Sequence, residues 1–313
     1  MSNPARAAAR VGGRMLVRRL PFPYRAPTAP VAVDLLPEEP RTGIDYDTSW
    51  ARRWPARMAR LAIVEGPMRL TVRTLADPHR RGLDRLATLA GPVVFAANHH
   101  SHLDTPLMLT SVPERFRHRL VVAAAADYFF PDRVRGAASA LAMGAVPIER
   151  TRVSRRSADD LADLISEGWS LLIFPEGGRS PDGWGQGHRG GAAYLAVRCG
   201  VPVVPVHLEG TGRVLGRGDK VPRPGSTVVT FGHPVRAEES EDARRFAVRI
   251  EAAVAALADE AVTDWWAAKK RAAAGTTPAL TGPDAPTWRR AWALGPRRPD
   301  RRRRSSRAWP RLG

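Results

Sequence analysis

The stretch Val93–Pro106, with the sequence VVFAANHHSHLDTP, predicts a strand, a polar turn and the start of a helix. Residues 93–97 form an uninterrupted apolar run, which is typical of a strand covered on both faces. Residues 98–104 are polar except for Leu103, and Pro106 suits the first turn of a helix. Similar apolar runs recur between helix-like segments across residues 92–235. They are Leu120–Ala125, Ala145–Ile148, Ser170–Phe174, Val203–His207 and Thr227–Phe231. Strands that alternate with helices predict an α/β fold with a mostly parallel central sheet flanked by helices.

Three helical segments are expected around this core. Residues 47–75 form an amphipathic, Trp- and Arg-rich N-terminal helical segment that Pro55 and Pro67 interrupt. Such a segment suits either a lipid interface or the cover of its own domain. Residues 157–167 begin with a Ser-x-x-Asp capping pattern, and residues 241–274 predict one long C-terminal helix ended by Gly275. The predicted organisation is a basic, disordered tail over 1–45, a domain over 46–274 with its core at 90–235, and an Arg/Trp/Pro-rich tail over 275–313.

The positive charge is concentrated at the two ends of the chain. The 313 residues carry 49 Lys and Arg against 31 Asp and Glu, a net charge of +18. Residues 1–25 contribute +6 and residues 285–313 contribute +9, so the rest of the chain is only +3. Basic ends attract polyanions such as nucleic acid or anionic lipid, although solvated tails and a transit peptide are also compatible. A nearly neutral body argues against nucleic-acid binding.

Two classes of structure are disfavoured by composition. The single cysteine, Cys199, excludes an internal disulfide and any multi-cysteine metal site. No apolar run approaches the ~18–20 residues of a membrane-spanning helix. We therefore expect no transmembrane helix.

His99 and Asp104 are the first candidates for chemistry. In a strand-to-helix turn, this spacing can place a carboxylate against one imidazole nitrogen. The carboxylate then orients the ring, so that the other nitrogen can take a proton. Because no Ser or Cys nucleophile is evident, the pair suits deprotonation of a hydroxyl that a substrate brings. Three alternatives remain at this point: a metal site built from the nearby histidines and Asp104, a purely structural cap, and Ser101 as a nucleophile without the glycines of a nucleophile elbow.

A second motif, FPEGGRS at residues 174–180, follows the predicted strand at 170–174. Gly177 and Gly178 allow close backbone approach to an anion, and Arg179 offers a forked donor set for phosphate. An ordinary Pro/Gly turn would have the same composition. GAVPIER at 144–150 and VPVVPV at 201–206 are unremarkable alone.

Together, the four segments resemble the glycerolipid acyltransferase family, of the lysophosphatidate (1-acylglycerol-3-phosphate) acyltransferase type. That family carries N-H-x-x-x-x-D, G-x-I-x-x-x-R, F-P-E-G-T-R-S and V-P-(V/I)-(V/I)-P-V in this order. The resemblance covers about residues 60–260. Val146 replaces the usual Ile, Arg189 replaces a usual Lys in a Gly-basic-Gly stretch, and Gly178 replaces Thr. Gly178 thus lacks a side-chain hydroxyl that could help to hold an acceptor.

The resemblance implies an O-acyltransferase that moves a fatty acyl group from acyl-CoA or acyl carrier protein to 1-acylglycerol-3-phosphate, giving phosphatidate. His99 would be the general base and Asp104 its orienting partner. The implied substrate-binding residues are Asn98, Ser101, Arg150, Glu176, Gly177 and Arg179. Backbone N–H groups near the turn or the helix start are expected to stabilise the oxyanion. No metal or organic cofactor is implied.

A lipid acceptor implies an anionic membrane surface as a partner and peripheral attachment at the cytoplasmic face. Residues 50–75 and 285–313 could supply this attachment. Other acceptors with the same chemistry are glycerol-3-phosphate, another lysophospholipid or a non-phosphorylated alcohol. A catalytically inactive lipid-binding homologue and a nucleic-acid-binding protein are the alternatives from other classes.

Overall fold

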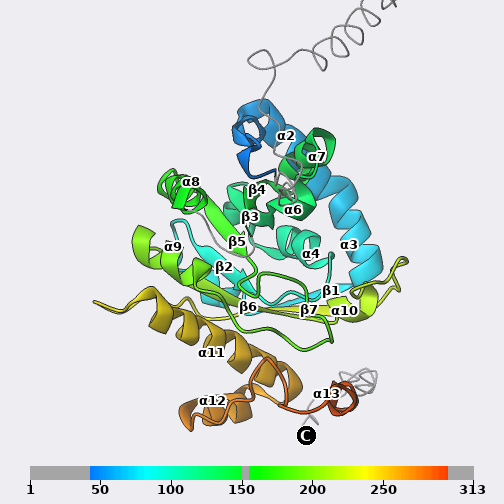
Figure 1. Cartoon of the computed structure of the whole chain (residues 1–313), viewed down its shortest axis with the longest axis vertical. Coiled ribbons are helices and arrows are strands. Elements are labelled where there is room, and N and C mark those ends of the chain that lie inside the picture. The colour runs from blue at the N-terminus through cyan, green and yellow to red at the C-terminus, as the bar shows by residue number, and fades with distance from the viewer. Residues whose placement is uncertain (1–42, 150–154, 295–313) are drawn as a thin grey trace, which may run out of the picture. The chain divides into compact units, whose positions relative to one another are not determined.

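Buried apolar strands form the centre of a seven-stranded sheet (Figure 1). The computed structural model describes residues 43–149 and 155–294. The strands are β1 (Pro78–Arg81), β2 (Val94–Ala97), β3 (Leu120–Ala125), β4 (Ala145–Ile148), β5 (Ser170–Ile173), β6 (Val203–Glu209) and β7 (Thr227–Phe231). Their order in the sheet is β1-β7-β6-β2-β5-β3-β4. Every neighbouring pair is parallel except β6 and β7. The predicted mostly parallel α/β fold is therefore confirmed.

Helices cover both faces of the sheet. They are α2 (Trp54–Ile63), α3 (Arg69–Ala76), α4 (Asp104–Ser111), α5 (Glu114–Arg117), α6 (Ala126–Phe129), α7 (Arg133–Met143), α8 (Arg155–Ser166), α9 (Gly191–Cys199), α10 (Thr211–Val214), α11 (Ala243–Val262), α12 (Trp265–Ala273) and α13 (Thr287–Leu294). Short 3-10 turns lie at Gly43–Asp45, Ser49–Arg52 and Asp84–Leu86, and a π-helical turn lies at Val64–Met68. Among the residues described, no helix combines the length and the apolar character that crossing a bilayer requires.

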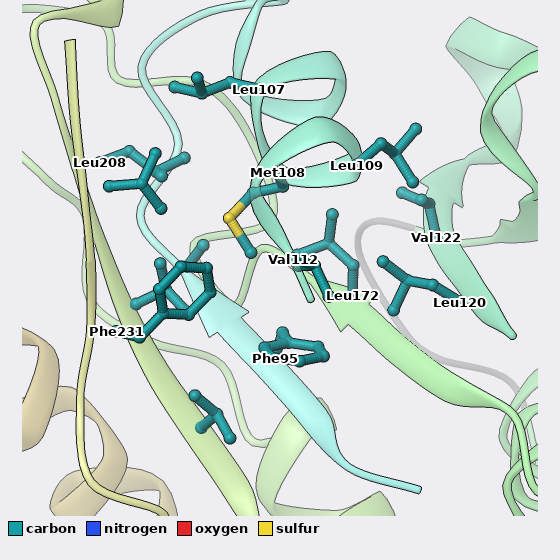
Figure 2. Packing of buried hydrophobic residues seen from close by; sticks show 14 of the residues in the cluster. Phe95, Leu107, Met108, Leu109, Val112, Leu120, Val122, Leu172, Leu208 and Phe231 are labelled. Carbon is teal, nitrogen blue, oxygen red and sulfur yellow. The ribbon is translucent and has the colours of Figure 1, made fainter. Parts of the chain in front are cut away.

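Alternate residues of the central strands point into two separate cores. On β2, Phe95 joins one cluster while Val94 joins the other. Figure 2 shows the first cluster, in which side chains of α4, including Met108, lie against Phe95 and Phe231. The second cluster contains residues of α8, α9 and α11. Packing of α4 on the sheet fixes the position of its first residue, Asp104, against the end of β2.

The six predicted strands are all present, and β1 was not predicted. Its sequence is Pro-His-Arg-Arg, and three of its four residues are exposed. β1 lies at the edge of the sheet and pairs with β7 alone. A strand at this position needs only backbone hydrogen bonds on one side, so no apolar pattern reveals it.

The predicted long helix over 241–274 is wrong as a single element. It is two helices, α11 and α12, that separate at Thr263 and Asp264. Asp264 is extended, and its carboxylate accepts a hydrogen bond from the Ala267 N–H at 2.8 Å, which caps α12. An Asp inside an apolar-periodic stretch thus starts a new helix. The Ser157–Asp160 capping prediction is also wrong, because α8 begins at Arg155 and Ser157 is buried inside it.

The prolines of the 47–75 segment act differently from each other. Pro67 lies inside the π-helical turn between α2 and α3 and interrupts regular α-helix as predicted. Pro55 does not interrupt a helix, because it lies in the first turn of α2, where its missing N–H costs nothing. The predicted tail over 1–45 lies almost wholly outside the described residues. Residues 275–294 belong to the predicted C-terminal tail, and they include α13.

Candidate active site

A cavity of about 300 Å³ lies where the carboxyl ends of β2, β5, β3 and β4 meet. These strands are neighbours in the sheet and parallel, so the turns that follow them converge at one edge. His99 enters the lining from the turn after β2, and Phe174 and Arg179 enter from the turn after β5. Ala123 on β3 and Ile148 on β4 belong to an apolar wall on the other side. The cavity therefore combines polar turns with apolar strands.

The structure brings His99 and Asp104 together. The imidazole Nδ1 lies 2.8 Å from the carboxylate Oδ2. The Asp104 side chain is completely buried, whereas that of His99 is 16% exposed and lines the cavity. A carboxylate accepts hydrogen bonds, so Nδ1 carries the proton and Nε2 keeps its lone pair. The His99 ring also stacks on Phe174, with ring centroids 4.2 Å apart, which holds its orientation.

Asp104 also acts as a structural cap. The same Oδ2 accepts the backbone N–H groups of His100 at 2.7 Å and Ser101 at 2.8 Å. These bonds shape the turn between β2 and α4. The orienting and capping hypotheses are therefore not alternatives, since one oxygen does both. Because the N–H groups of His100 and Ser101 donate to Asp104, they are not available to stabilise an oxyanion, which was one of the roles expected for N–H groups of this turn.

Asn98 and Ser101 do not line the cavity. The Asn98 amide donates to Leu208 O at 2.9 Å and accepts from Leu208 N at 2.6 Å, which joins the end of β2 to β6. The buried Ser101 hydroxyl donates to Leu215 O at 2.6 Å and accepts from Leu103 N at 3.0 Å. Both side chains support the backbone. Ser101 is not placed to act as a nucleophile or to contact a substrate.

Glu176 lies beneath the cavity and does not line it. Its carboxylate is 2% exposed and accepts the N–H of His99 at 2.9 Å on one oxygen and that of Gln186 at 2.9 Å on the other. Burial raises the pKa of Glu176 to about 7, although the two backbone hydrogen bonds oppose this shift. Glu176 therefore joins the β2 turn to the loop at 180–186, and its contact with substrate stays a prediction.

The Gly-Gly turn after β5 forms an arginine cradle together with side chains that line the cavity. Gly177 has φ +73°, and a Cβ there would lie 2.8 Å from Nε of Arg189. Glycine thus lets the Arg189 guanidinium lie directly on the backbone. Arg179, Arg189 and Arg217 all line the cavity. The N–H groups of Gly178 and Arg179 donate no hydrogen bond within the described part of the chain.

Some site residues were found by sequence reasoning and others were missed. Arg150 lies outside the described residues. Arg217 was missed because it belongs to no motif, although the Ser101–Leu215 hydrogen bond holds its loop near the site. Gln186 was also missed, because a glutamine between glycines gives no signal of its hydrogen bonds to Gly178 O and Arg179 O.

A second histidine, His102, lines the same cavity and is paired with Tyr128. His102 Nε2 lies 2.9 Å from the Tyr128 hydroxyl, and the two rings stack with centroids 5.1 Å apart. Nε2 of His102 therefore contacts Tyr128 and does not point to a metal site shared with Asp104. In the described ranges, no group of three or more His, Cys, Asp or Glu side chains is arranged to hold a metal ion.

Part of the chain is similar to known proteins. Residues 77–209 match the model of the Acyltransferase family. The chain is 34% identical over 143 residues to 1-acyl-sn-glycerol-3-phosphate acyltransferase BAT2, chloroplastic, of Brassica napus, covering 45% of this chain and 39% of that protein. It is 31% identical over 164 residues to 1-acyl-sn-glycerol-3-phosphate acyltransferase LPAT1, chloroplastic, of Arabidopsis thaliana, covering 51% of this chain and 44% of that protein. The chain thus spans less than half the length of these relatives.

One solved structure is also similar, the 1-acyl-sn-glycerophosphate (LPA) acyltransferase PlsC from Thermotoga maritima. It has a TM-score of 0.49 and 22% sequence identity, and covers 67% of this chain and 81% of that chain.

Proposed function

We propose that the protein transfers a fatty acyl group from an acyl thioester to the hydroxyl of 1-acylglycerol-3-phosphate, on the premise that residues 77–209 match the model of the Acyltransferase family. The product is phosphatidate, in phospholipid synthesis. The observation that carries the proposal is the His99–Asp104 pair in the wall of a cavity that also exposes arginines and an apolar surface. Relatives named 1-acyl-sn-glycerol-3-phosphate acyltransferases support this acceptor.

His99 acts as the general base. Its Nε2 takes the proton of the acceptor hydroxyl as that oxygen attacks the thioester carbonyl carbon. The negative charge of Asp104, 2.8 Å from Nδ1, stabilises the imidazolium that forms. Collapse of the tetrahedral intermediate breaks the carbon–sulfur bond, and the imidazolium returns its proton to the departing thiolate. Protons and charges balance, and this sequence of steps requires no cofactor.

The oxyanion donors in this mechanism come from the turn after β5. The N–H groups of His99, His100 and Ser101 already donate to Glu176 and Asp104. The N–H groups of Gly178 and Arg179 stay available and belong to residues that line the cavity. Donors held in place before the reaction stabilise developing negative charge effectively.

The acceptor phosphate is assigned to the arginine side chains of the cavity. Arg179 and Arg189 line it together, and charge-assisted hydrogen bonds to phosphate are strong. Arg150 remains a predicted contributor. The apolar wall, with Ala123 and Ile148, suits an acyl chain. Acyl-CoA and acyl carrier protein are both compatible donors.

A second candidate is the same reaction on another acceptor, and Gly178 favours it. Nothing lies within 4 Å of the position that a Cβ on Gly178 would occupy. The site therefore has open space where the related family has a Thr side chain. A different acceptor headgroup could fill this space.

Peripheral attachment to an anionic membrane is part of the proposal, because the acceptor is a lipid. On α2, Trp54 is 71% exposed and Met58 is 42% exposed. Exposed tryptophan favours the interfacial layer of a bilayer. Attachment at the cytoplasmic face stays a prediction.

The proposal is tested with purified protein, labelled acyl-CoA or acyl carrier protein, and a panel of acceptors. His99→Ala should lower kcat by about a thousandfold, the middle of the range for loss of a general base. His102→Ala is the matched control, since it removes a second imidazole of the cavity wall, one whose Nε2 lies against the Tyr128 hydroxyl. Equal activity of His99→Ala and wild type would refute the base assignment. Activity on a neutral alcohol alone would refute the phosphate acceptor.

A further inference from the structure

Helix α13 rests on the loop that follows the Gly-Gly turn of the active site. Arg290 donates to the Asp182 carboxylate from Nε at 2.8 Å and from Nη2 at 2.7 Å. The indole N–H of Trp184 donates to Arg290 O at 3.1 Å. Gly183, with φ +91°, leaves the room that Leu294 fills, since a Cβ there would lie 2.8 Å from Leu294 Cδ1. The inner stripe of α13 is therefore the pair Arg290 and Leu294.

This loop continues directly into the cavity. Gln186 lines the cavity, donates from its backbone to Glu176, and donates from its side chain to Gly178 O and Arg179 O. Gly185 N donates to Leu280 O at 3.0 Å, so the segment before α13 also holds the loop. Contacts thus run without a break from α13 to the residues that line the site.

The opposite stripe of α13 is apolar, aromatic and exposed. Trp288 is 66% exposed and Trp292 is 81% exposed. They are four residues apart, so they share one helix face. That face lies opposite Arg290 and Leu294, because two residues correspond to about 200° of rotation. None of the residues of α13 is buried. Two tryptophans held in water on one face need a partner that covers them.

The charge of the same region selects the partner. Arg289 stacks on Trp288, with its guanidinium carbon 5.0 Å from the ring centroid. Residues 276–313 carry ten arginines against two aspartates, Asp284 and Asp300. Each basic residue near an anionic bilayer adds to binding, and tryptophan favours the interfacial layer. An exposed pair of tryptophans within so basic a stretch of sequence therefore fits an anionic lipid surface.

We propose that the Trp288/Trp292 face of α13 is a docking surface for an anionic lipid bilayer, and that its contacts with Asp182 and Trp184 keep the active-site loop beside the docked membrane. The inference rests on the proposed function only in taking a membrane lipid as the acceptor. Helix α12, which also exposes Trp265 and Trp266, makes no such contact with the loop among the described residues.

The test uses the full chain and vesicles of equimolar phosphatidylcholine and phosphatidylglycerol. The double variant Trp288→Ser/Trp292→Ser should lower the partition coefficient about tenfold or more, since two large apolar side chains lose their burial. The matched control, Trp265→Ser/Trp266→Ser, removes two other exposed tryptophans and should change the coefficient by less than about twofold. Vesicles of phosphatidylcholine alone should bind the wild type more weakly. Equal losses in both double variants would overturn the assignment to α13.

Coupling to the site is tested with Asp182→Asn. This variant should bind vesicles like the wild type. Its kcat/KM for a vesicle-embedded acceptor should fall about fivefold, which is the size of effect that loss of one ion pair can cause. The value for a short-chain, water-soluble acceptor should not change. Unchanged kcat/KM on vesicles would overturn the coupling.

Two further outcomes are distinguishable from these. If no acceptor is acylated, the proposed function fails while vesicle binding still decides the docking surface. If wild type self-associates in sedimentation velocity and Trp288→Ser/Trp292→Ser does not, the face binds a second copy and the lipid assignment is overturned.

Discussion

Replacement of Asp104 by Asn tests how the site works, because it removes one charge and almost no volume. Oδ2 of Asp104 meets three donors: Nδ1 of His99 and the N–H groups of His100 and Ser101. Asn can place its single oxygen there and keep the turn. It loses the negative charge that faces the imidazolium, and its NH2 group then occupies the position of Oδ1, which has no hydrogen-bond partner.

Two magnitudes follow from this geometry. Unit charges about 4 Å apart interact by about 4 kcal/mol at an effective dielectric constant of 20, which corresponds to about a thousandfold in rate. A buried amide without an acceptor costs about 1–3 kcal/mol of stability. We therefore expect Asp104→Asn to lower kcat about a thousandfold while leaving KM for the acceptor within about threefold, because the arginine cradle is untouched.

The assay follows thiol release from acyl-CoA by a colorimetric reagent, and thermal unfolding checks the fold. The matched control is Asp132→Asn, an exposed carboxylate that accepts the Arg135 N–H at the start of α7. Asn caps helices as well as Asp does, so this control should keep full activity. A folded Asp104→Asn enzyme with kcat within about tenfold of wild type would refute the charge argument, since tenfold is only about 1.4 kcal/mol.

Three further predictions concern the turn after β5. Gly178→Thr meets open space, so it should fold normally and change the ratio of kcat/KM between phosphorylated acceptors. Gly177→Ala should destabilise the protein by about 1–2 kcal/mol, since φ is +73° and Arg189 must move, whereas Gly187→Ala, with nothing within 4 Å, should not. Burial raises the pKa of Glu176 from 4.5 to about 7, so the folded state binds its proton more tightly, and stability should fall by about 3 kcal/mol as pH rises from about 4.5 to 7. Glu176→Gln should flatten that part of the melting-temperature curve against pH, and an unchanged slope would contradict the assignment.

Local patterns predicted the part of the fold in which burial dominates. The four residues of β2 and the four of β5 are all buried, and their apolar runs are visible in the sequence. β1 and the break at Asp264 were missed for opposite reasons. β1 has no buried pattern to detect, and Asp264 interrupts a periodic pattern that continues on both sides. The strand β1 and the start of α12 both depend on hydrogen bonds to backbone groups, and the pattern of apolar residues does not reveal these bonds.

The candidate site was predictable to a different degree for each residue. The His99–Asp104 contact needs only one turn of chain, so spacing alone anticipated it. Arg217 reaches the same cavity from a loop more than a hundred residues later, through the hydrogen bond between Ser101 and Leu215. Glu176 was identified, but its bridging position was not, because the sequence does not reveal that its two oxygens accept His99 N and Gln186 N.

Strand order explains why the four motifs have different tasks. β2 lies between β5 and β6 in the sheet. The motif after β2 therefore meets the motif after β5, and Ser180 N donates to His99 O at 2.8 Å. The VPVVPV motif forms the start of β6 on the other side of β2, and β6 holds Asn98 through Leu208. β4 is two strands from β5, so its motif lines the far part of the cavity with Ile148 and Glu149. The position of each motif relative to β2 thus fixes its task. The motifs after β2 and β5 meet at the cavity, the β6 motif supports β2, and the β4 motif lines the far part of the cavity. A substitution in the β6 motif should accordingly act through stability, whereas replacement of Arg179, which lines the cavity after β5, should act through substrate binding.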